Sequence, residues 1–328
     1  MISYSIPHIF PQFNKNSATP QPRLSELKLW KYRSEDDIMM DSMERNILLT
    51  IEYDGTNFCG WQRQPDVRTV QGTLEDVLSK VCGRRVLIEG SGRTDAGVHA
   101  FGQRATFCGD FGIPTERIAY AANNILSESM KDGDVRITKA EEVPKGFHAR
   151  FDAVGKKYIY KIRNADFMPV FLRNYRYRVW RKLDLDAMGQ ATGFIVGTRD
   201  FACFQSAGGT PRESTVRTVK SLVLKSAVQD LNYTGFMAVG TGNTEFAGAA
   251  ADKTATAAGI DIDIEIVGDG FLYNMVRIIA GTLIDVGTGK TEPKFMKEII
   301  RSKERGLAGF TAPPQGLYLA EVYYRRNS

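Results

Sequence analysis

A carboxylate within a glycine-rich segment is the part of this sequence best suited to chemistry. The segment reads Gly-Ser-Gly-Arg-Thr-Asp-Ala-Gly-Val-His-Ala-Phe-Gly-Gln over residues 90–103 and places Arg93 and Asp95 between glycines. Glycine lets the backbone approach a ligand closely, so both side chains can point out of the loop toward a substrate. On this segment alone, a turn or cap role for Asp95 remains the alternative.

Other kinds of catalytic or cofactor site are disfavoured by the sequence. The glycine-rich segment lacks the G-x-x-x-x-G-K-[ST] pattern, and a strand pattern rather than a helix follows it, which argues against phosphate and dinucleotide loops. The four cysteines are far apart and only three histidines occur. These facts argue against a structural zinc, a multi-histidine metal site and a hydrolase triad.

A single arginine interrupts an apolar helical pattern near the C-terminus. From Phe271 to Ile284, Arg277 is the only charged residue. An unpaired charge on a buried helix is costly, so Arg277 requires an acidic partner. A structural salt bridge to another acid, or a long side chain that reaches the surface, are the alternatives.

Positive charge is concentrated in one stretch of the chain. Ten Lys and Arg residues and two acids fall within residues 150–182, a local balance of +8, so the rest of a chain with net charge +5 carries −3. Basic residues such as Arg150 and Lys157 can bind phosphates, and interleaved aromatic residues such as Tyr158 can stack on unpaired bases. The stretch therefore suggests an RNA partner. A solvated strand face above a core stripe, with Tyr158 as a half-buried strand residue, is the alternative.

These residues need regular elements to bring them together. Alternating apolar patterns predict strands, and apolar residues at the helical period predict helices. The expected strands cover residues 47–53, 85–89, 103–108, 134–139, 157–163, 216–225, 260–267 and 317–324, and the expected helices cover 70–81, 115–126, 183–196, 271–286 and 293–301. Because strands and helices do not alternate strictly, an α+β fold with largely antiparallel sheets is favoured.

The chain divides by composition into a leader and two lobes. Residues 1–45 lack periodicity and are interpreted as a disordered leader or a start assigned too early. Residues 46–148 are predicted to form an N-terminal α+β lobe with the glycine-rich loop, and residues 149–328 a C-terminal α+β lobe. Residues 226–259, rich in Ala, Gly and Thr, are expected to be a surface insertion. No apolar run approaches the ~20 residues of a membrane span.

Seven segments, in this order, resemble the signature motifs of the TruA family of tRNA pseudouridine synthases. They lie at residues 52–55 (EYDG), 60–64 (GWQRQ), 92–100 (GRTDAGVHA), 147–151 (FHARF), 157–160 (KYIY), 271–277 (FLYNMVR) and 316–319 (GLYL). The leader and the insertion are departures from the family pattern, and Ser91 stands where many relatives have alanine. The resemblance implies a pseudouridine synthase fold, with two similar lobes whose sheets join across a basic RNA-binding cleft.

The resemblance also implies an activity and the roles of individual residues. It implies an isomerase that converts uridine to pseudouridine at positions 38 to 40 of the tRNA anticodon stem-loop. Asp95 would be the catalytic nucleophile, Arg93 would orient the RNA or the target nucleotide, Tyr158 would stack near the flipped base, and Arg277 would pair with Asp95. Arg150 and Lys157 are expected to bind the substrate. A cytoplasmic homodimer that binds tRNA is implied, with an organellar location as the alternative if the leader is a transit peptide.

The implied reaction makes demands that these residues can meet. It breaks the N1–C1′ bond of uridine and rejoins the uracil through C5, so it needs a carboxylate near C1′ and the base but no cofactor or metal. Attack at C1′ and deprotonation at C2′ both remain open. We expect Arg277 to keep Asp95 ionised through a charge-assisted hydrogen bond. The competing hypotheses are a catalytically silent RNA-binding protein and a glycosidase of free nucleosides, which would need a second carboxylate near Asp95.

Overall fold

The computed structural model describes residues 44–127, 133–208, 213–230 and 258–325. The predicted leader, apart from its last residues, and the central part of the predicted insertion therefore lie outside the described residues. The chain from Glu44 onward forms one compact unit. In the described part of the chain, no helix has the length and apolar character that crossing a membrane requires.

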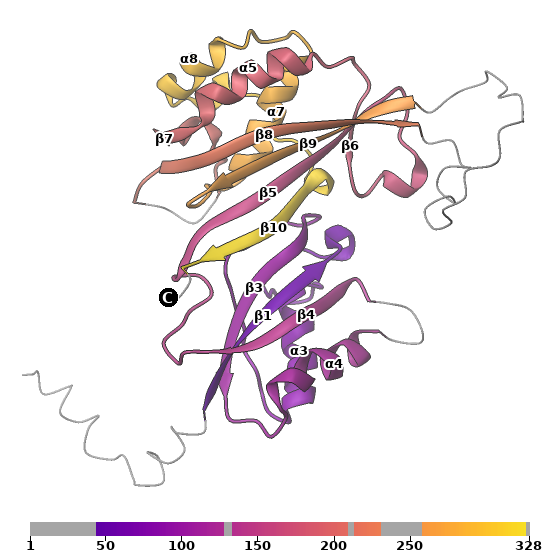
Figure 1. Ribbon diagram of the computed structural model, residues 1–328, viewed down its shortest axis with the longest axis vertical. Coiled ribbons are helices and arrows are strands. Elements are labelled where there is room, and N and C mark those ends of the chain that lie inside the picture. Colours follow the sequence, from indigo (N-terminus) through magenta and orange to yellow (C-terminus); the bar gives the residue numbers. More distant parts are fainter. Residues whose placement is uncertain (1–43, 128–132, 209–212, 231–257, 326–328) are drawn as a thin grey trace, which may run out of the picture. The chain divides into compact units, whose positions relative to one another are not determined.

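A large mixed sheet runs through this unit, in the strand order β4-β1-β3-β10-β5-β9-β8-β7 (Figure 1). The strands are β1 (Arg45–Tyr53), β2 (Glu89–Gly90), β3 (His99–Gly109), β4 (Val135–Val143), β5 (Ala153–Asn164), β6 (Tyr177–Val179), β7 (Gly197–Asp200), β8 (Val216–Asp230), β9 (Ala258–Gly268) and β10 (Leu317–Tyr324). Neighbours are antiparallel except for the parallel pairs β3–β10 and β5–β6. The expected α+β class with a mainly antiparallel sheet is therefore confirmed.

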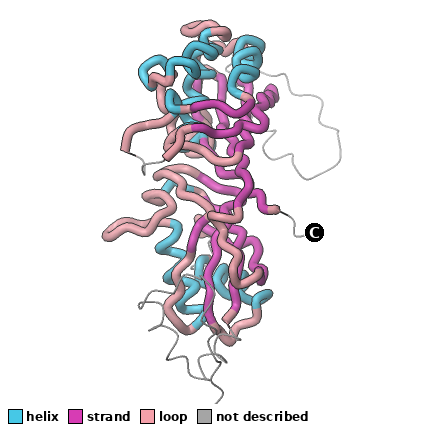
Figure 2. The backbone as a smooth tube through the Cα atoms, turned by 90° about the vertical axis from the view of Figure 1, so that its left-hand side faces the viewer, coloured by secondary structure: helices cyan, strands magenta, loops and turns pink. Residues whose placement is uncertain are grey.

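Strand β10 joins the two halves of the sheet. It pairs with β3 from the first half and with β5 from the second, so the strands of both halves continue into one layer (Figure 2). Strands β3 and β5 carry or flank the segments that were predicted to do chemistry. The C-terminal strand therefore sets the distance between the glycine-rich loop and the basic stretch.

Five α-helices pack against the sheet among the described residues. They are α3 (Val70–Cys82), α4 (Thr115–Leu126), α5 (Leu185–Ile195), α7 (Met275–Gly287) and α8 (Phe295–Ser302). Helices α3 and α4 lie beside β1, β3 and β4, whereas α5, α7 and α8 gather at the β7–β9 end (Figure 1). Thr69 caps the start of α3, since its hydroxyl accepts a hydrogen bond from the Gly72 amide at 3.2 Å. Nearly every residue of α7 is buried, as its apolar pattern predicts.

The strand expected at residues 85–89 is wrong for most of its length. Only Glu89 and Gly90 pair with β3. Val86 and Ile88 are buried as the alternating pattern requires, but their amides donate to the Ser79 hydroxyl at 2.9 Å and the Glu75 carboxylate at 3.1 Å. Side chains of α3 thus replace a neighbouring strand as the hydrogen-bond partner.

Other boundaries differ where strands lack apolar patterning. Strand β8 extends to Asp230 and β9 begins at Ala258, so both ends of the predicted insertion at 226–259 are strand residues. Strands β6 and β7 are short and were not predicted. The predicted strand at 103–108 begins earlier, at His99, inside the glycine-rich segment.

Candidate active site

The glycine-rich loop between β2 and β3 is fixed by bonds from its own ends. The Ser91 hydroxyl donates to the side-chain oxygen of Gln103 at 2.8 Å, and the Gln103 amide group donates to the Gly92 carbonyl at 2.9 Å. At the loop's far side, the hydroxyls of Tyr53 and Thr94 are 2.7 Å apart. These buried contacts give the loop one conformation, which a catalytic side chain needs.

Gly60 allows a second loop to lie directly against this one. Its φ of +86° belongs to the left-handed region, and a Cβ there would lie 2.8 Å from the Thr94 carbonyl oxygen. The next amide, of Trp61, donates to that carbonyl at 3.0 Å. The segment Gly60–Gln64 therefore lies against the loop that carries Arg93 and Asp95.

Asp95 and Arg277 form the pair that the family resemblance implies. The Nη1 of Arg277 lies 3.3 Å from Oδ2 of Asp95, a long contact for a hydrogen bond but well within the range of an ion pair. Arg277 is held by two further acceptors. Its Nε donates to the Ala312 carbonyl at 2.7 Å, and Nη1 donates to Oδ1 of Asn274 at 2.8 Å. The guanidinium is thus held in place independently of the carboxylate that it faces.

The first turn of α7 explains how the arginine reaches the carboxylate. Asn274 precedes the helix with a φ of 60°, a left-handed conformation that asparagine tolerates better than most residues. Its amide nitrogen donates to the hydroxyl of Ser206 at 3.1 Å. Asn274 thus fixes the start of the helix and orients the Arg277 side chain.

The pKa of Asp95 is raised, although Arg277 was expected to keep the carboxylate ionised. Burial is the largest cause and raises the pKa, while the charge and hydrogen bond of Arg277 lower it. Arg277 acts in the predicted direction, but the desolvation of the carboxylate outweighs it. A carboxylate with a raised pKa is more basic than a solvent-exposed one, and Arg277 limits that rise.

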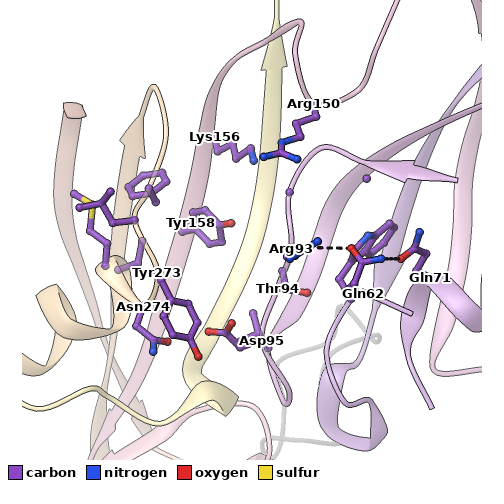
Figure 3. A pocket seen from close by; sticks show the side chains of 18 of the residues that line it. Gln62, Gln71, Arg93, Thr94, Asp95, Arg150, Lys156, Tyr158, Tyr273 and Asn274 are labelled. Atoms are coloured by element: carbon purple, nitrogen blue, oxygen red, sulfur yellow. Dashed lines mark hydrogen bonds between the residues drawn. The ribbon is translucent and has the colours of Figure 1, made fainter. Parts of the chain in front are cut away.

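Asp95 lies on the wall of a cleft of about 790 Å³. The cleft is lined on one side by the glycine-rich loop and on the other by β5 and the segment before α7 (Figure 3). Three basic side chains, Arg93, Arg150 and Lys156, also line it. Such a volume is typical of sites that enclose a small ligand, and positive charge around it suits an anionic one.

Tyr158 contributes an aromatic wall to this cleft. It extends from β5 on the side facing Asp95 (Figure 3), is 8% exposed, and packs edge-on against Phe271 with ring centroids 5.2 Å apart. Burial, with smaller contributions from Tyr53 and Asp95, raises the pKa of Tyr158 well above its ordinary value. The phenol therefore stays protonated, which suits packing or hydrogen bonding better than proton abstraction.

Lys157 does not lie in the cleft, so the prediction that it binds the substrate there is wrong. Its Nζ pairs with Glu265 at 2.8 Å, on the opposite face of β5. Successive side chains of a strand point to opposite faces, so the residue on the face of Tyr158 is Lys156. Lys156 lines the cleft and donates to the Ser91 carbonyl at 2.8 Å.

The other predicted binding residues do face the cleft. Arg150 lies at its rim, exposed, with its guanidinium carbon 5.6 Å from the Phe151 ring centroid. Arg93 is exposed on the loop next to Asp95, and its Nε donates to the side-chain oxygen of Gln62 at 2.9 Å. The structure thus brings four of the predicted residues together around Asp95, namely Arg93, Arg150, Tyr158 and Arg277.

Several lining residues were not assigned roles from the sequence. Lys156 could have been found from its two-residue spacing to Tyr158 on a predicted strand. Gln62, Tyr273 and Asn274 belong to motifs that support the family resemblance, but nothing in the sequence shows which way they point. In the described ranges, no group of three or more His, Cys, Asp or Glu residues could hold a metal ion.

A partly buried carboxylate paired with an arginine, in a basic cleft, defines a site for nucleophilic or acid–base chemistry on an anionic substrate. Comparison with known proteins specifies the class. The family profile described as tRNA pseudouridine synthase matches residues 49–152 and 193–325. The chain therefore belongs to the tRNA pseudouridine synthase family.

Individual relatives carry a more specific name. The chain is 42% identical over 280 residues to the tRNA pseudouridine synthase A of Acetivibrio thermocellus, which covers 85% of this chain and 100% of the relative. It is 40% identical over 285 residues to the tRNA pseudouridine synthase A 2 of Clostridium tetani, with 86% and 100% covered. The similarity thus spans these relatives from end to end.

Proposed function

We propose that this protein isomerises uridine to pseudouridine in tRNA, with Asp95 as the catalytic carboxylate. The observation that carries the proposal is the pairing of Asp95 with Arg277 on the wall of a basic cleft, 3.3 Å apart. Family membership and full-length relatives named tRNA pseudouridine synthase A support the same activity. The enzyme is an isomerase, so substrate and product have the same atoms.

The reaction requires a carboxylate that is ionised at the start. Whether Asp95 attacks C1′ as a nucleophile or removes the C2′ proton, the N1–C1′ bond breaks and its electron pair leaves with the uracil. The uracil then turns, C5 bonds to C1′, the C5 proton is lost, and the carboxylate is regenerated. Arg277 favours the ionised Asp95, while partial burial strengthens its reactivity toward the sugar.

The cleft has the properties that an extruded nucleotide needs. A uridine stacked in a stem-loop has to leave its stack before its C1′ can be reached. A cleft of about 790 Å³ can enclose the flipped nucleotide, with Tyr158 as an apolar wall beside the base. Arg93, Arg150 and Lys156 would then bind the flanking phosphates.

The finer features of the proposal concern the substrate and the assembly. We place the target in the anticodon arm, at positions 38 to 40, and the tRNA across two similar lobes joined at β10. The expectation of a homodimer in the cytoplasm is kept as part of the proposal. Besides Arg277, three basic residues line the cleft, Arg93, Arg150 and Lys156, and they support a polyanionic substrate larger than one nucleotide.

A glycosidase of free nucleosides fits this cleft less well. Besides Asp95, the cleft is lined by the carboxylates of Glu75 and Glu89. Glu75 is 3% exposed and accepts hydrogen bonds from Gln71, Ile88 and Arg63, and Glu89 pairs with His148. Both carboxylates have partners of their own, which leaves Asp95 as the cleft carboxylate that faces Arg277.

The proposal is tested with tRNA transcripts that carry tritium at C5 of uridine. Isomerisation releases the C5 hydrogen to water, so tritium release measures turnover directly. We expect release from a transcript with uridines at positions 38 to 40 and none from a matched transcript with cytidines there. Equal release from both transcripts would place the target elsewhere. Formation of free uracil from uridine, which keeps its C5 tritium, would favour the glycosidase alternative.

A further inference from the structure

A chain of side-chain hydrogen bonds runs from the backbone near β2 to Arg93 in the cleft. Gln62 accepts a hydrogen bond from Nε of Arg93 at 2.9 Å and donates one to Oε1 of Gln71 at 2.6 Å. Figure 3 shows the side chains of Gln71, Gln62 and Arg93 in line, with dashed lines for the two hydrogen bonds. The proposed chemistry does not involve Gln62 or Gln71, so it does not explain why these two side chains are aligned with Arg93.

The orientation of the Gln71 amide is fixed at both ends. Its Oε1 accepts a hydrogen bond from the Arg63 backbone amide at 2.9 Å, in addition to the one from Gln62. Its Nε2 donates to the Ile88 carbonyl at 2.9 Å and to Oε1 of Glu75 at 3.1 Å. A backbone amide can only donate and a carbonyl can only accept, so turning the Gln71 amide over would break all four bonds.

Glu75 anchors this arrangement below Gln71. Its side chain is almost fully buried on α3, and Oε1 also accepts the Ile88 backbone amide at 3.1 Å. Its other oxygen, Oε2, accepts from Nη1 of Arg63 at 3.0 Å. A buried carboxylate with each oxygen bonded is held firmly, so Gln71 rests on a rigid base.

The fixed orientation passes from Gln71 to Gln62 and then to Arg93. Because Gln71 presents its oxygen, Gln62 has to present its nitrogen to Gln71 and its oxygen to Arg93. That oxygen takes the Nε–H of Arg93, which leaves the two terminal nitrogens of the guanidinium directed away from Gln62. These two nitrogens form the edge of an arginine that can bind a phosphate at two points.

We infer that Gln62, oriented by Gln71, is a positioning residue that sets the Arg93 guanidinium to bind a phosphate of the RNA next to the target nucleotide. This inference rests on the proposed function, and it goes beyond it by assigning a role to residues that do not touch the reacting atoms. A flexible, exposed arginine loses conformational entropy when it binds, and a guanidinium held by Gln62 loses less.

The test compares Gln62→Met with Gln64→Met. Methionine has nearly the size of glutamine and no amide, and Gln64 is an exposed residue of the same loop that does not line the cleft. For Gln62→Met we expect tRNA affinity and kcat/KM to fall about 10-fold, mainly through KM, because a phosphate contact is present before and during the reaction. The slope of log affinity against log salt concentration should become shallower, by up to about the amount that one phosphate contact contributes. Gln64→Met should behave as wild type.

The same substitution in an Arg93→Met background separates positioning from folding. If Gln62 acts through Arg93, then adding Gln62→Met to Arg93→Met should change affinity less than twofold. We call the hydrogen-bonded chain Gln71–Gln62–Arg93 the relay. Gln71→Met removes the bond between Gln71 and Gln62 and should cause a smaller loss of tRNA affinity. It replaces Gln62→Met in the test if that variant folds poorly.

Two results would overturn the inference. One is Gln62→Met and Gln64→Met having the same affinity and salt dependence. The other is an equal loss from Gln62→Met with and without Arg93. Affinity and its salt dependence are measured by binding and need no turnover. If the wild-type protein bound tRNA without turnover, the proposed function would be contradicted, but the role of Gln62 could still be tested.

Discussion

Replacing Arg277 by methionine removes the counter-charge of Asp95 without a large change in volume. The carboxylate would remain partly buried, with about a third of its side chain exposed, and no cation at 3.3 Å would offset its desolvation. The pKa of Asp95, already raised, should therefore rise further. Because the reaction needs the ionised carboxylate, activity falls as pH drops through that pKa, so the acid limb of the pH profile should move to higher pH.

The structure sets the size of this effect. A hydrogen bond to a charged group contributes roughly 1.5–3 kcal/mol. The contact is long and Asp95 is accessible to water, so the low end of about 1.5 kcal/mol applies, which corresponds to roughly a tenfold loss of kcat. The buried Ala312 carbonyl would also lose its donor at 2.7 Å. That loss costs about 2 kcal/mol of unfolding free energy and should lower the melting temperature by roughly 4–8 °C.

Single-turnover rates across pH and melting temperatures measure both effects. Arg277→Lys should rescue only partly, because an ammonium cannot reproduce the contacts of the guanidinium with Asp95, Asn274 and Ala312. The double variant with Asp95→Asn should be no less active than the worse single variant, as expected for residues that act as one unit. Wild-type rates and an unshifted acid limb in Arg277→Met would refute the argument.

Three further predictions concern parts of the chain outside this pair. Lys156→Met should raise KM for tRNA several-fold and weaken its salt dependence, whereas Lys157→Met, on the other face of β5, should leave both unchanged; steady-state kinetics at two salt concentrations decide. Burial of His99 lowers its pKa below the ordinary 6.5, so the unfolded chain binds the proton first and stability should fall as pH drops below about 6.5. Urea unfolding at pH 7.5 and 5.5 should show this loss, and His99→Gln should reduce it. Replacing residues 231–257 by Asn-Gly should keep activity within a few-fold, because the flanking residues are register partners of β8 and β9; a large loss of tritium release would show that this segment shapes the RNA site.

The isolated charge of Arg277 was the most informative signal in the sequence. One arginine in an apolar helix implies either a partner or a side chain that reaches the surface, and the structure supplies Asp95 as a partner. The direction of the Asp95 pKa could not be predicted in the same way. It depends on how deeply the carboxylate is buried, and burial is set by loops that are distant in the sequence.

Two predictions were wrong because the local sequence pattern does not show which way a side chain or a backbone amide points. Lys157 was predicted to bind the substrate because basic residues surround Tyr158, but strand alternation assigns that face to Lys156. Residues 85–89 have the alternation of a strand, yet their amides bond to side chains of α3. The relay through Gln62 has no sequence signature, since it requires the loops and α3 to meet in three dimensions.

The central claim is that the Asp95 carboxylate performs chemistry on a uridine of tRNA. Its most direct test is tritium release from C5-labelled tRNA by Asp95→Asn, with tRNA affinity measured on the same preparation. The substitution keeps the shape of the side chain and removes its charge. Because burial raises the pKa of Asp95, loss of the charge should not destabilise the fold. We therefore expect a folded protein that binds tRNA nearly as wild type and releases no tritium above background. Tritium release at the wild-type rate from Asp95→Asn would contradict the account.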